Sequence, residues 1–143
     1  MKKTTFPKPI VQEHLLGCAI ACTAFILGSN YKSTIKFFKN GKKRARNLGF
    51  YCKEIVEVLN NSKGNFEYRY IKDKMKRKIY QDNTIVFIKR SKQYPVGHYL
   101  CRFKGFWMDP WINSPKNKNI KEAIAGFRKR LPGKVIYAIF QKK

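Results

Sequence analysis

The sequence lacks the segments that would place it in a membrane or in a secretory pathway. No apolar run reaches the length of a membrane-spanning helix, because the mostly apolar stretch 15–28 is short and is interrupted by Cys18, Cys22 and Thr23. The basic N-terminus is not followed by a hydrophobic core or a cleavage site at signal-peptide spacing. We therefore expect a soluble, cytoplasmic protein, with a secreted effector as the alternative.

Acidic residues are scarce, since 8 Asp and Glu stand against 32 Lys and Arg, for a net charge of +24. Such a charge attracts nucleic acid, an anionic membrane or an acidic protein segment. The basic residues are spread over the whole chain, as compositional bias would also produce. The densest stretches, 36–46 and 72–78, match no helix-turn-helix, zinc-finger or ribonucleoprotein motif. The charge predicts an acidic partner without identifying it.

The cysteines do not form a pattern typical of a disulfide scaffold or a zinc site. All four (Cys18, Cys22, Cys52 and Cys101) lie in apolar or aromatic stretches rather than in loops, which favours reduced thiols. There is no Cys-x-x-Cys knuckle, and the segment that carries Cys18 and Cys22 is apolar, so zinc is disfavoured. We expect neither a metal nor another cofactor.

The chain is long enough for one domain, 1–143, with a hydrophobic content of 43% that is typical of a folded protein. Residues 1–11 read as an extended lead-in, and a basic loop joins the second and third helices. The apolar periodicity and the turn residues predict these elements: helices over 18–27, 33–38 (capped by Ser33), 50–59 and 120–130, and strands over 66–71, 84–88, 98–103, 106–109 and 135–140. Helices followed by antiparallel strands indicate an α+β domain with a helical layer packed on a sheet.

Cys18 stands where a loop turns into the first helix. A thiol there meets the unpaired N–H groups of the first turn and the positive end of the helix dipole, which both stabilise a thiolate. A thiolate nucleophile needs a histidine base, and the chain has two histidines. His14 is too close to Cys18 along the chain to face it across a cleft. His98 begins a predicted strand and is the better candidate.

The predicted hairpin around Lys104-Gly105 can bring a carboxylate to His98. With a two-residue turn, Leu100 faces Asp109, and Asp109 is diagonal to His98 on the same face of the sheet. Diagonal neighbours lie about 7–8 Å apart at the backbone, within reach of the two side chains. A loop longer by one residue would move Asp109 to the other face. In the assumed register Trp111 stands beside His98 and could shield the pair from water, or it could be an ordinary core tryptophan.

An acyl-transfer site also needs hydrogen-bond donors for the oxyanion. The backbone N–H of Cys18 and the side-chain amide of Gln12, six residues earlier, could supply two. Gln12, Cys18, His98 and Asp109 thus form a complete set of oxyanion donor, nucleophile, base and orienting group. Against this, a buried helix cysteine is usually inert packing.

The order of these residues resembles that of papain-like cysteine peptidases. Within them it resembles the bacteriocin-processing family, the peptidase domains of ABC transporters that cleave leader peptides after a double glycine. The resemblance is carried by Gln12-x5-Cys18-Ala-Ile-Ala-Cys22, then His98-Tyr99, then Asp109-Pro110, and it extends to the closing strand. Gly17 replaces the acidic residue that usually precedes the nucleophile, Ala19 replaces the usual glycine, and the interval from His98 to Asp109 is shorter than usual.

The resemblance implies a papain-like fold in which Cys18 is the nucleophile, His98 the general base and then acid, Asp109 the orienting group and Gln12 the oxyanion donor. Cys22 falls on a structural position of the helix. The predicted function is a cysteine peptidase that acts on a peptide or protein, with an acidic substrate captured by the basic surface. Two alternatives stay open: an acyl transferase or deamidase with the same triad, and a basic protein that binds nucleic acid or an acidic partner on an inactive peptidase fold.

Overall fold

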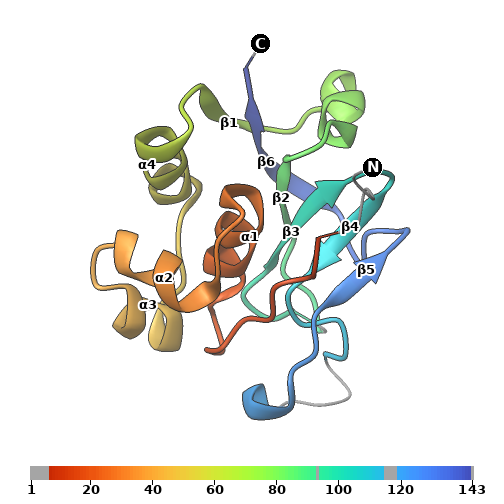
Figure 1. The fold of residues 1–143 in the computed structure, drawn as a ribbon. Helices are drawn as coiled ribbons and strands as arrows, with labels where there is room; N and C mark the ends of the chain where they lie inside the picture. Colours follow the sequence, from red (N-terminus) through yellow and green to blue (C-terminus); the bar gives the residue numbers. More distant parts are fainter. Residues whose placement is uncertain (1–6, 93, 115–118, 143) are drawn as a thin grey trace, which may run out of the picture.

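A computed structural model describes residues 7–92, 94–114 and 119–142. The helical elements are α1 (Cys18–Leu27), α2 (Tyr31–Thr34), η1 (Ile35–Phe37), α3 (Gly41–Asn47), α4 (Cys52–Ser62), η2 (Asp73–Tyr80) and η3 (Ile120–Glu122). The helices α1 to α4 come first in the chain and lie to one side of a sheet that is formed mainly by the C-terminal half (Figure 1). The turn η2 packs against the opposite face of that sheet through Ile79. The predicted α+β class is confirmed.

The sheet has six strands in the order β1-β6-β2-β3-β4-β5, and every pairing is antiparallel. The strands are β1 (Phe66–Tyr70), β2 (Ile85–Ile88), β3 (His98–Phe103), β4 (Phe106–Asp109), β5 (Gly126–Arg128) and β6 (Val135–Gln141). The last strand thus returns to the middle of the sheet and lies between β1 and β2.

Helix α1 lies at the centre of the molecule and packs against β3 (Figure 1). It is apolar on all sides, and nine of its ten residues are buried, which is why its sequence shows no amphipathic pattern. Its core continues through α4 to one face of the sheet, where Tyr99 and Cys101 of β3 lie. A smaller cluster, with Leu100 and Trp107, fills the opposite face.

The prediction for α1 is confirmed at both ends: it spans Cys18–Leu27, and Gly28 ends it in the left-handed conformation. The prediction for the second helix is wrong in its cap. The N-cap is Asn30, whose side chain accepts a hydrogen bond from the backbone N–H of Ser33, so Ser33 lies inside the first turn. The helix then tightens into η1 instead of continuing to Phe38.

The segment expected as a basic loop contains α3. Its one deeply buried apolar side chain is Ala45, so no apolar periodicity marked it in the sequence. The start of the helix at Gly41 lies close to the backbone of η1, since a Cβ there would lie 2.5 Å from the carbonyl oxygen of Ile35. The next helix, α4, begins two residues later than predicted and ends three later, and Glu54 of its first turn accepts the backbone N–H of Tyr51.

The predicted helix over 120–130 is wrong. The chain forms the short turn η3 and then strand β5, which pairs with β4 and closes one edge of the sheet. Phe127 does pack toward the core, against Phe25 of α1, but it does so from a strand. The spacing of Ile120, Ile124 and Phe127 matched a helical period without forming one.

The register predicted for the β3–β4 hairpin is confirmed, since Cys101 pairs with Met108 and Phe103 with Phe106. The turn has two residues, Lys104 and Gly105, and both have positive φ, as the twist of a tight hairpin requires. Asp109 therefore lies on the face of the sheet that the two-residue turn demands.

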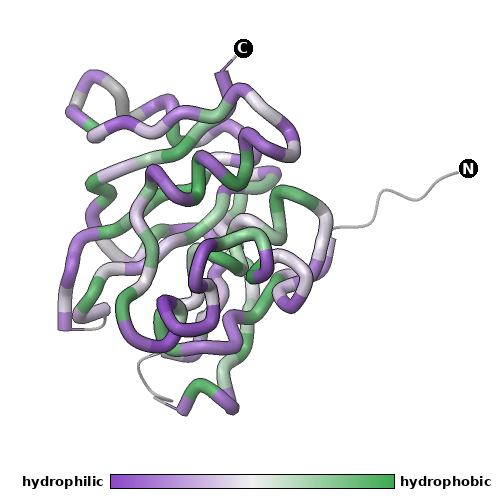
Figure 2. Tube along the Cα trace, turned by 90° about the vertical axis from the view of Figure 1, so that its left-hand side faces the viewer, coloured by the Kyte–Doolittle hydropathy of each residue, from purple (hydrophilic) through white to green (hydrophobic). Residues whose placement is uncertain are grey.

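Hydrophilic segments dominate the outside of the molecule and apolar ones run through its interior (Figure 2). Within the described ranges, none of the helices combines the length and apolar character that crossing a membrane requires.

Gly97, directly before His98, is a position where the fold tolerates no side chain. Its φ is +82°, and a Cβ would lie 2.2 Å from Cζ of Phe87 and 2.9 Å from the carbonyl oxygen of Ile88. Gly105 has nearly the same φ, +85°, but a Cβ there would meet nothing within 4 Å. An alanine at Gly105 would therefore strain the backbone only, whereas an alanine at Gly97 would strain the backbone and also clash with its neighbours.

We predict that Gly105→Ala lowers the free energy of unfolding by about 1 kcal/mol, the cost of a left-handed alanine. Gly97→Ala should cost about 1–3 kcal/mol more, because Phe87 and the β2 backbone must shift. Urea unfolding of both variants measures the difference. Equal losses in the two variants would contradict the packing assigned to Gly97.

Candidate active site

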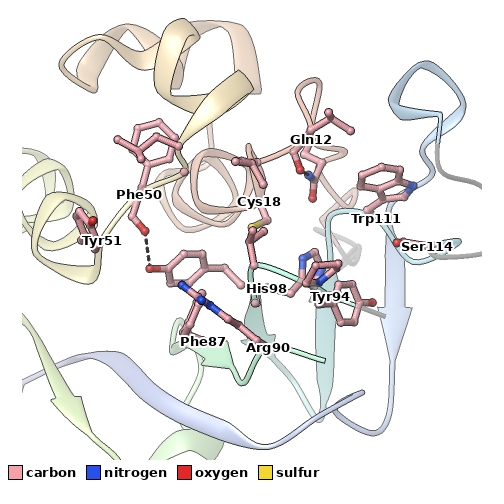
Figure 3. Close-up of a pocket in the computed structure, with 18 of the residues that line it drawn as sticks. Gln12, Cys18, Phe50, Tyr51, Phe87, Arg90, Tyr94, His98, Trp111 and Ser114 are labelled. Carbon is pink, nitrogen blue, oxygen red and sulfur yellow. Dashed lines mark hydrogen bonds between the residues drawn. The ribbon is translucent and has the colours of Figure 1, made fainter. Parts of the chain in front are cut away.

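Cys18 is the first residue of α1, and its side chain points into a cleft opposite His98 (Figure 3). Gly17 is the N-cap residue, and no side chain caps the helix. The N–H groups of the first turn, including that of Cys18, are therefore available to an anion at the sulfur or beside it. This is the position that the sequence predicted for the thiol.

His98 lies between Cys18 and Asp109. Its Nε2 is 2.7 Å from Oδ1 of Asp109, so the other ring nitrogen, Nδ1, is left for the thiol. Burial by itself lowers the pKa of His98, but the hydrogen bonds to the Asp109 carboxylate and the Cys18 side chain raise that pKa to about 9. His98 thus holds its proton at neutral pH and loses it only as the pH rises through about 9.

Asp109 is fully buried, and its carboxylate receives three hydrogen bonds. Oδ1 accepts from His98 and, at 3.0 Å, from the backbone N–H of Trp111. Oδ2 accepts from Nη1 of Arg128 at 3.0 Å. Burial raises the pKa of Asp109, but His98, the Trp111 N–H and Arg128 together hold it below its usual value, so the carboxylate is ionised.

One aromatic side chain covers a face of the His98 ring, and a second lies in the same cleft. Tyr94 stacks on it with ring centroids 4.3 Å apart and planes within 5°. Trp111 lines the same cleft and is buried (Figure 3). A histidine that is 3% exposed is thereby kept from water, which strengthens its interaction with Asp109. Trp111 lines the same cleft as His98, but it lies beyond the end of β4, outside the paired register from which its position was predicted. Tyr94 was not singled out in the sequence.

Gln12 reaches the cleft next to Cys18, but its amide is turned away from the role that the sequence predicted. Nε2 donates to the carbonyl oxygens of His14 and Leu15, each at 3.0 Å. Oε1 is buried and, within the described part of the chain, has no hydrogen-bond partner. Exchanging the two atoms would set Oε1 against two carbonyl oxygens, so this orientation follows from the backbone.

The side chain of His14 contacts Tyr31. Its Nδ1 is 2.9 Å from the hydroxyl of Tyr31, and the two rings are stacked. The same hydroxyl fills the space beside Gly17, where a Cβ would lie 2.0 Å from it. This explains why glycine precedes Cys18 in this chain: the space for a side chain is taken by Tyr31.

The cleft has a volume of about 790 Å³ and is mainly apolar, as ligand-binding pockets of proteins usually are. One wall comes from the loop before α4, with Leu48, Phe50 and Tyr51, and the other from the β2–β3 loop, with Arg90 and Val96. The hydroxyl of Tyr99 donates to the carbonyl oxygen of Phe50 at 2.9 Å and ties the first wall to β3 (Figure 3).

The remaining cysteines are buried free thiols. Burial raises the pKa of Cys22, Cys52 and Cys101 in each case, and Cys22 and Cys101 have no exposed surface. A raised pKa and low exposure make a thiol unreactive. Among the four cysteines described, Cys18 is the one that His98 contacts.

No protein-family profile matches the sequence, and no curated protein matches it either. The fold is similar to the crystal structure of the peptidase domain of Streptococcus ComA, a bi-functional ABC transporter involved in a quorum sensing pathway. The two superpose with a TM-score of 0.52 over 94% of this chain and 97% of that domain, at 20% sequence identity. The chain has the papain-like fold of that peptidase domain. The fold expected from the resemblance is thus confirmed.

The sequence predicted one site with Gln12, Cys18, His98, Asp109 and Trp111. Gln12, Cys18, His98 and Trp111 line the cleft, and Asp109 lies buried behind it, hydrogen-bonded to His98 and to the Trp111 backbone. The prediction missed Arg128, because the segment that carries it was taken for a helix. It also missed Tyr94, whose only signal was an aromatic residue before Pro95 and Gly97.

We predict that iodoacetamide at pH 7 alkylates Cys18 and leaves Cys22, Cys52 and Cys101 unmodified in the folded chain. His98 is the base beside the Cys18 thiol, so His98→Ala should slow alkylation roughly tenfold or more. Mass spectrometry of the digested protein gives the labelled site, and alkylation in denaturant provides the control in which all four react. Faster labelling of Cys52, or no effect of His98→Ala, would contradict this site.

Proposed function

We propose that the chain is a cysteine peptidase that uses Cys18, His98 and Asp109 as a catalytic triad. The observation that carries the proposal is the position of His98. Its Nε2 is hydrogen-bonded to a buried carboxylate, and its other ring nitrogen is left for the Cys18 thiol at the start of α1. The fold shared with a peptidase domain supports it. An apolar cleft at the same thiol supports it further.

In the first half of the reaction, the Cys18 thiolate attacks the scissile carbonyl carbon and forms a thiohemiacetal oxyanion. The His98 imidazolium then gives its proton to the leaving amine, and the C–N bond breaks to leave a thioester on Cys18. Asp109 holds the imidazolium in place and stabilises its charge. The low polarity around Tyr94 and Trp111 screens the charges poorly, so the attraction between the imidazolium and the Asp109 carboxylate is strong.

In the second half, neutral His98 takes a proton from water, and the resulting hydroxide attacks the thioester carbon. The acid product leaves, and Cys18 and His98 return to the thiolate–imidazolium pair. An amine in place of that water would make the same chain an acyl transferase, and a side-chain amide in place of the peptide bond would make it a deamidase. The triad is common to all three reactions, so the acceptor must be measured.

The oxyanion would be bound by the backbone N–H of Cys18 and by Gln12. In the free chain the Gln12 amide N–H groups are held by His14 and Leu15. We infer that substrate binding turns this amide, so that one N–H group gives up its hydrogen bond to a backbone carbonyl and donates to the oxyanion instead. The unpaired Oε1 lowers the cost of that turn, because it gives up no hydrogen bond with a described residue.

The predicted rival is a binding protein on the same fold, recruited to nucleic acid or to an acidic protein by its charge. It predicts an unreactive Cys18 together with affinity for random DNA that falls steeply with salt. The peptidase proposal predicts a reactive Cys18. The alkylation experiment and a DNA titration over 50–300 mM salt therefore separate the two functions.

Removal of triad members should abolish cleavage of a proteome-derived peptide library, with products identified by mass spectrometry. We expect no cleavage by Cys18→Ala, and a loss in kcat of roughly a hundredfold or more for Asp109→Asn, which keeps the shape but loses the charge. Full activity in Cys18→Ala would overturn the proposal. Cys22→Ala is the matched control, since it removes a thiol one helical turn away.

Gln12→Ala should lower kcat by roughly 10²–10³-fold, the cost of one lost oxyanion donor, with little change in alkylation of Cys18. Gln141→Ala, at the exposed end of β6, is the matched control and should behave as the wild type. If Gln12→Ala keeps its kcat, the oxyanion is held without Gln12, and its amide belongs to the loop alone.

A further inference from the structure

Asp109 has a cationic partner on each flanking strand. His98 reaches it from β3 and Arg128 from β5, and each lies diagonal to it on the same face of the sheet. The two cations use different oxygens of the carboxylate, Oδ1 for His98 and Oδ2 for Arg128. A fully buried carboxylate is therefore shared between the catalytic histidine and an arginine.

We propose that Arg128 is a positioning residue that sets how strongly Asp109 holds the proton of His98, an inference that rests on the proposed triad. Arg128 does not line the cleft and so would not touch substrate. It acts through Asp109 alone. No other strand residue described here donates to Oδ2 of that carboxylate.

The physical reason lies in what His98 must do. In the acylation step His98 gives its proton to the leaving amine, and a carboxylate that binds the imidazolium too strongly resists that transfer. A buried Asp–His pair is a strong interaction, because the surroundings screen it poorly. Arg128 supplies a second positive charge to the same carboxylate, so it weakens the hold of Asp109 on the proton while keeping the carboxylate ionised.

Of the described groups that face the His98–Asp109 pair, Arg128 is the one that carries a permanent positive charge. From α1 the thiols of Cys18 and Cys22 face the His98–Asp109 pair, and from the β2–β3 loop the neutral ring of Tyr94 stacks on His98. Arg128 is 27% exposed at its side chain, so it also connects this buried pair to the surface at the sheet edge.

The test uses the full chain and titrates His98 by NMR of its imidazole Cε1–H over pH 5–11. The chain has two histidines, and His14→Gln identifies the His98 signal. Arg128→Gln keeps a neutral N–H donor and removes the charge, so His98 should titrate about one pH unit higher than in the wild type. Arg128→Lys keeps the charge and should titrate as the wild type does. An unchanged or lower titration point in Arg128→Gln would overturn the proposal.

Arg69→Gln is the matched control. Arg69 lies on β1, the other edge strand, and pairs with Glu67 at 2.9 Å, so the same substitution removes a surface ion pair far along the sheet from His98. It should leave the His98 titration unchanged. A shift equal to that of Arg128→Gln would assign the effect to net charge and would count against Arg128.

Kinetics on a cleaved library peptide provide the second readout. Arg128→Gln should lower kcat roughly tenfold to a hundredfold with KM unchanged, and Arg128→Lys should recover most of that loss. A rise in KM alone would contradict a role through His98. If the wild-type chain cleaves no peptide, the proposed peptidase fails, and the NMR titration still decides whether Arg128 shares the carboxylate.

Discussion

The register of the β3–β4 hairpin is the constraint on which the candidate site depends. Side chains alternate across a strand, so a slip of one residue would turn Asp109 away from His98 and from Arg128 together. The two-residue turn at Lys104 and Gly105 fixes that register, and burial of Trp107 and Met108 on opposite faces reinforces it. A site on the sheet is thus held by the backbone geometry of a turn at the far end of the hairpin.

Around that register, three parts of the chain contribute different chemistry. Helix α1 supplies a thiol at its uncapped start, and β3 and β4 supply the imidazole and the carboxylate. The segment before α1 supplies an amide whose N–H groups are engaged by its own loop. The thiol, imidazole and carboxylate are therefore already together in the free chain, whereas the proposed oxyanion donor must turn.

The sequence predicted what strong patterns mark. Apolar runs, the glycine cap and the hairpin turn located α1, β2 and the β3–β4 pair, and the motif spacing located Cys18, His98 and Asp109. The sequence-based prediction failed where the apolar pattern was weak or where it had the spacing of another element. Helix α3 buries only Ala45 and packs closely at Gly41, so its sequence shows no apolar periodicity. Strand β5 was predicted as helix because Ile120, Ile124 and Phe127 have helical spacing, although only Phe127 lies in the strand, and Arg128 was therefore missed.

The Tyr99 hydroxyl bond to the carbonyl oxygen of Phe50 has a mechanical consequence. Tyr99 directly follows His98 on β3, and Phe50 belongs to the opposite wall of the cleft, just before α4. A ligand that pushes this wall outward therefore pulls on the strand residue next to the base. The hydrogen bond therefore links the position of this wall to the strand that carries His98, so displacement of one would strain the other.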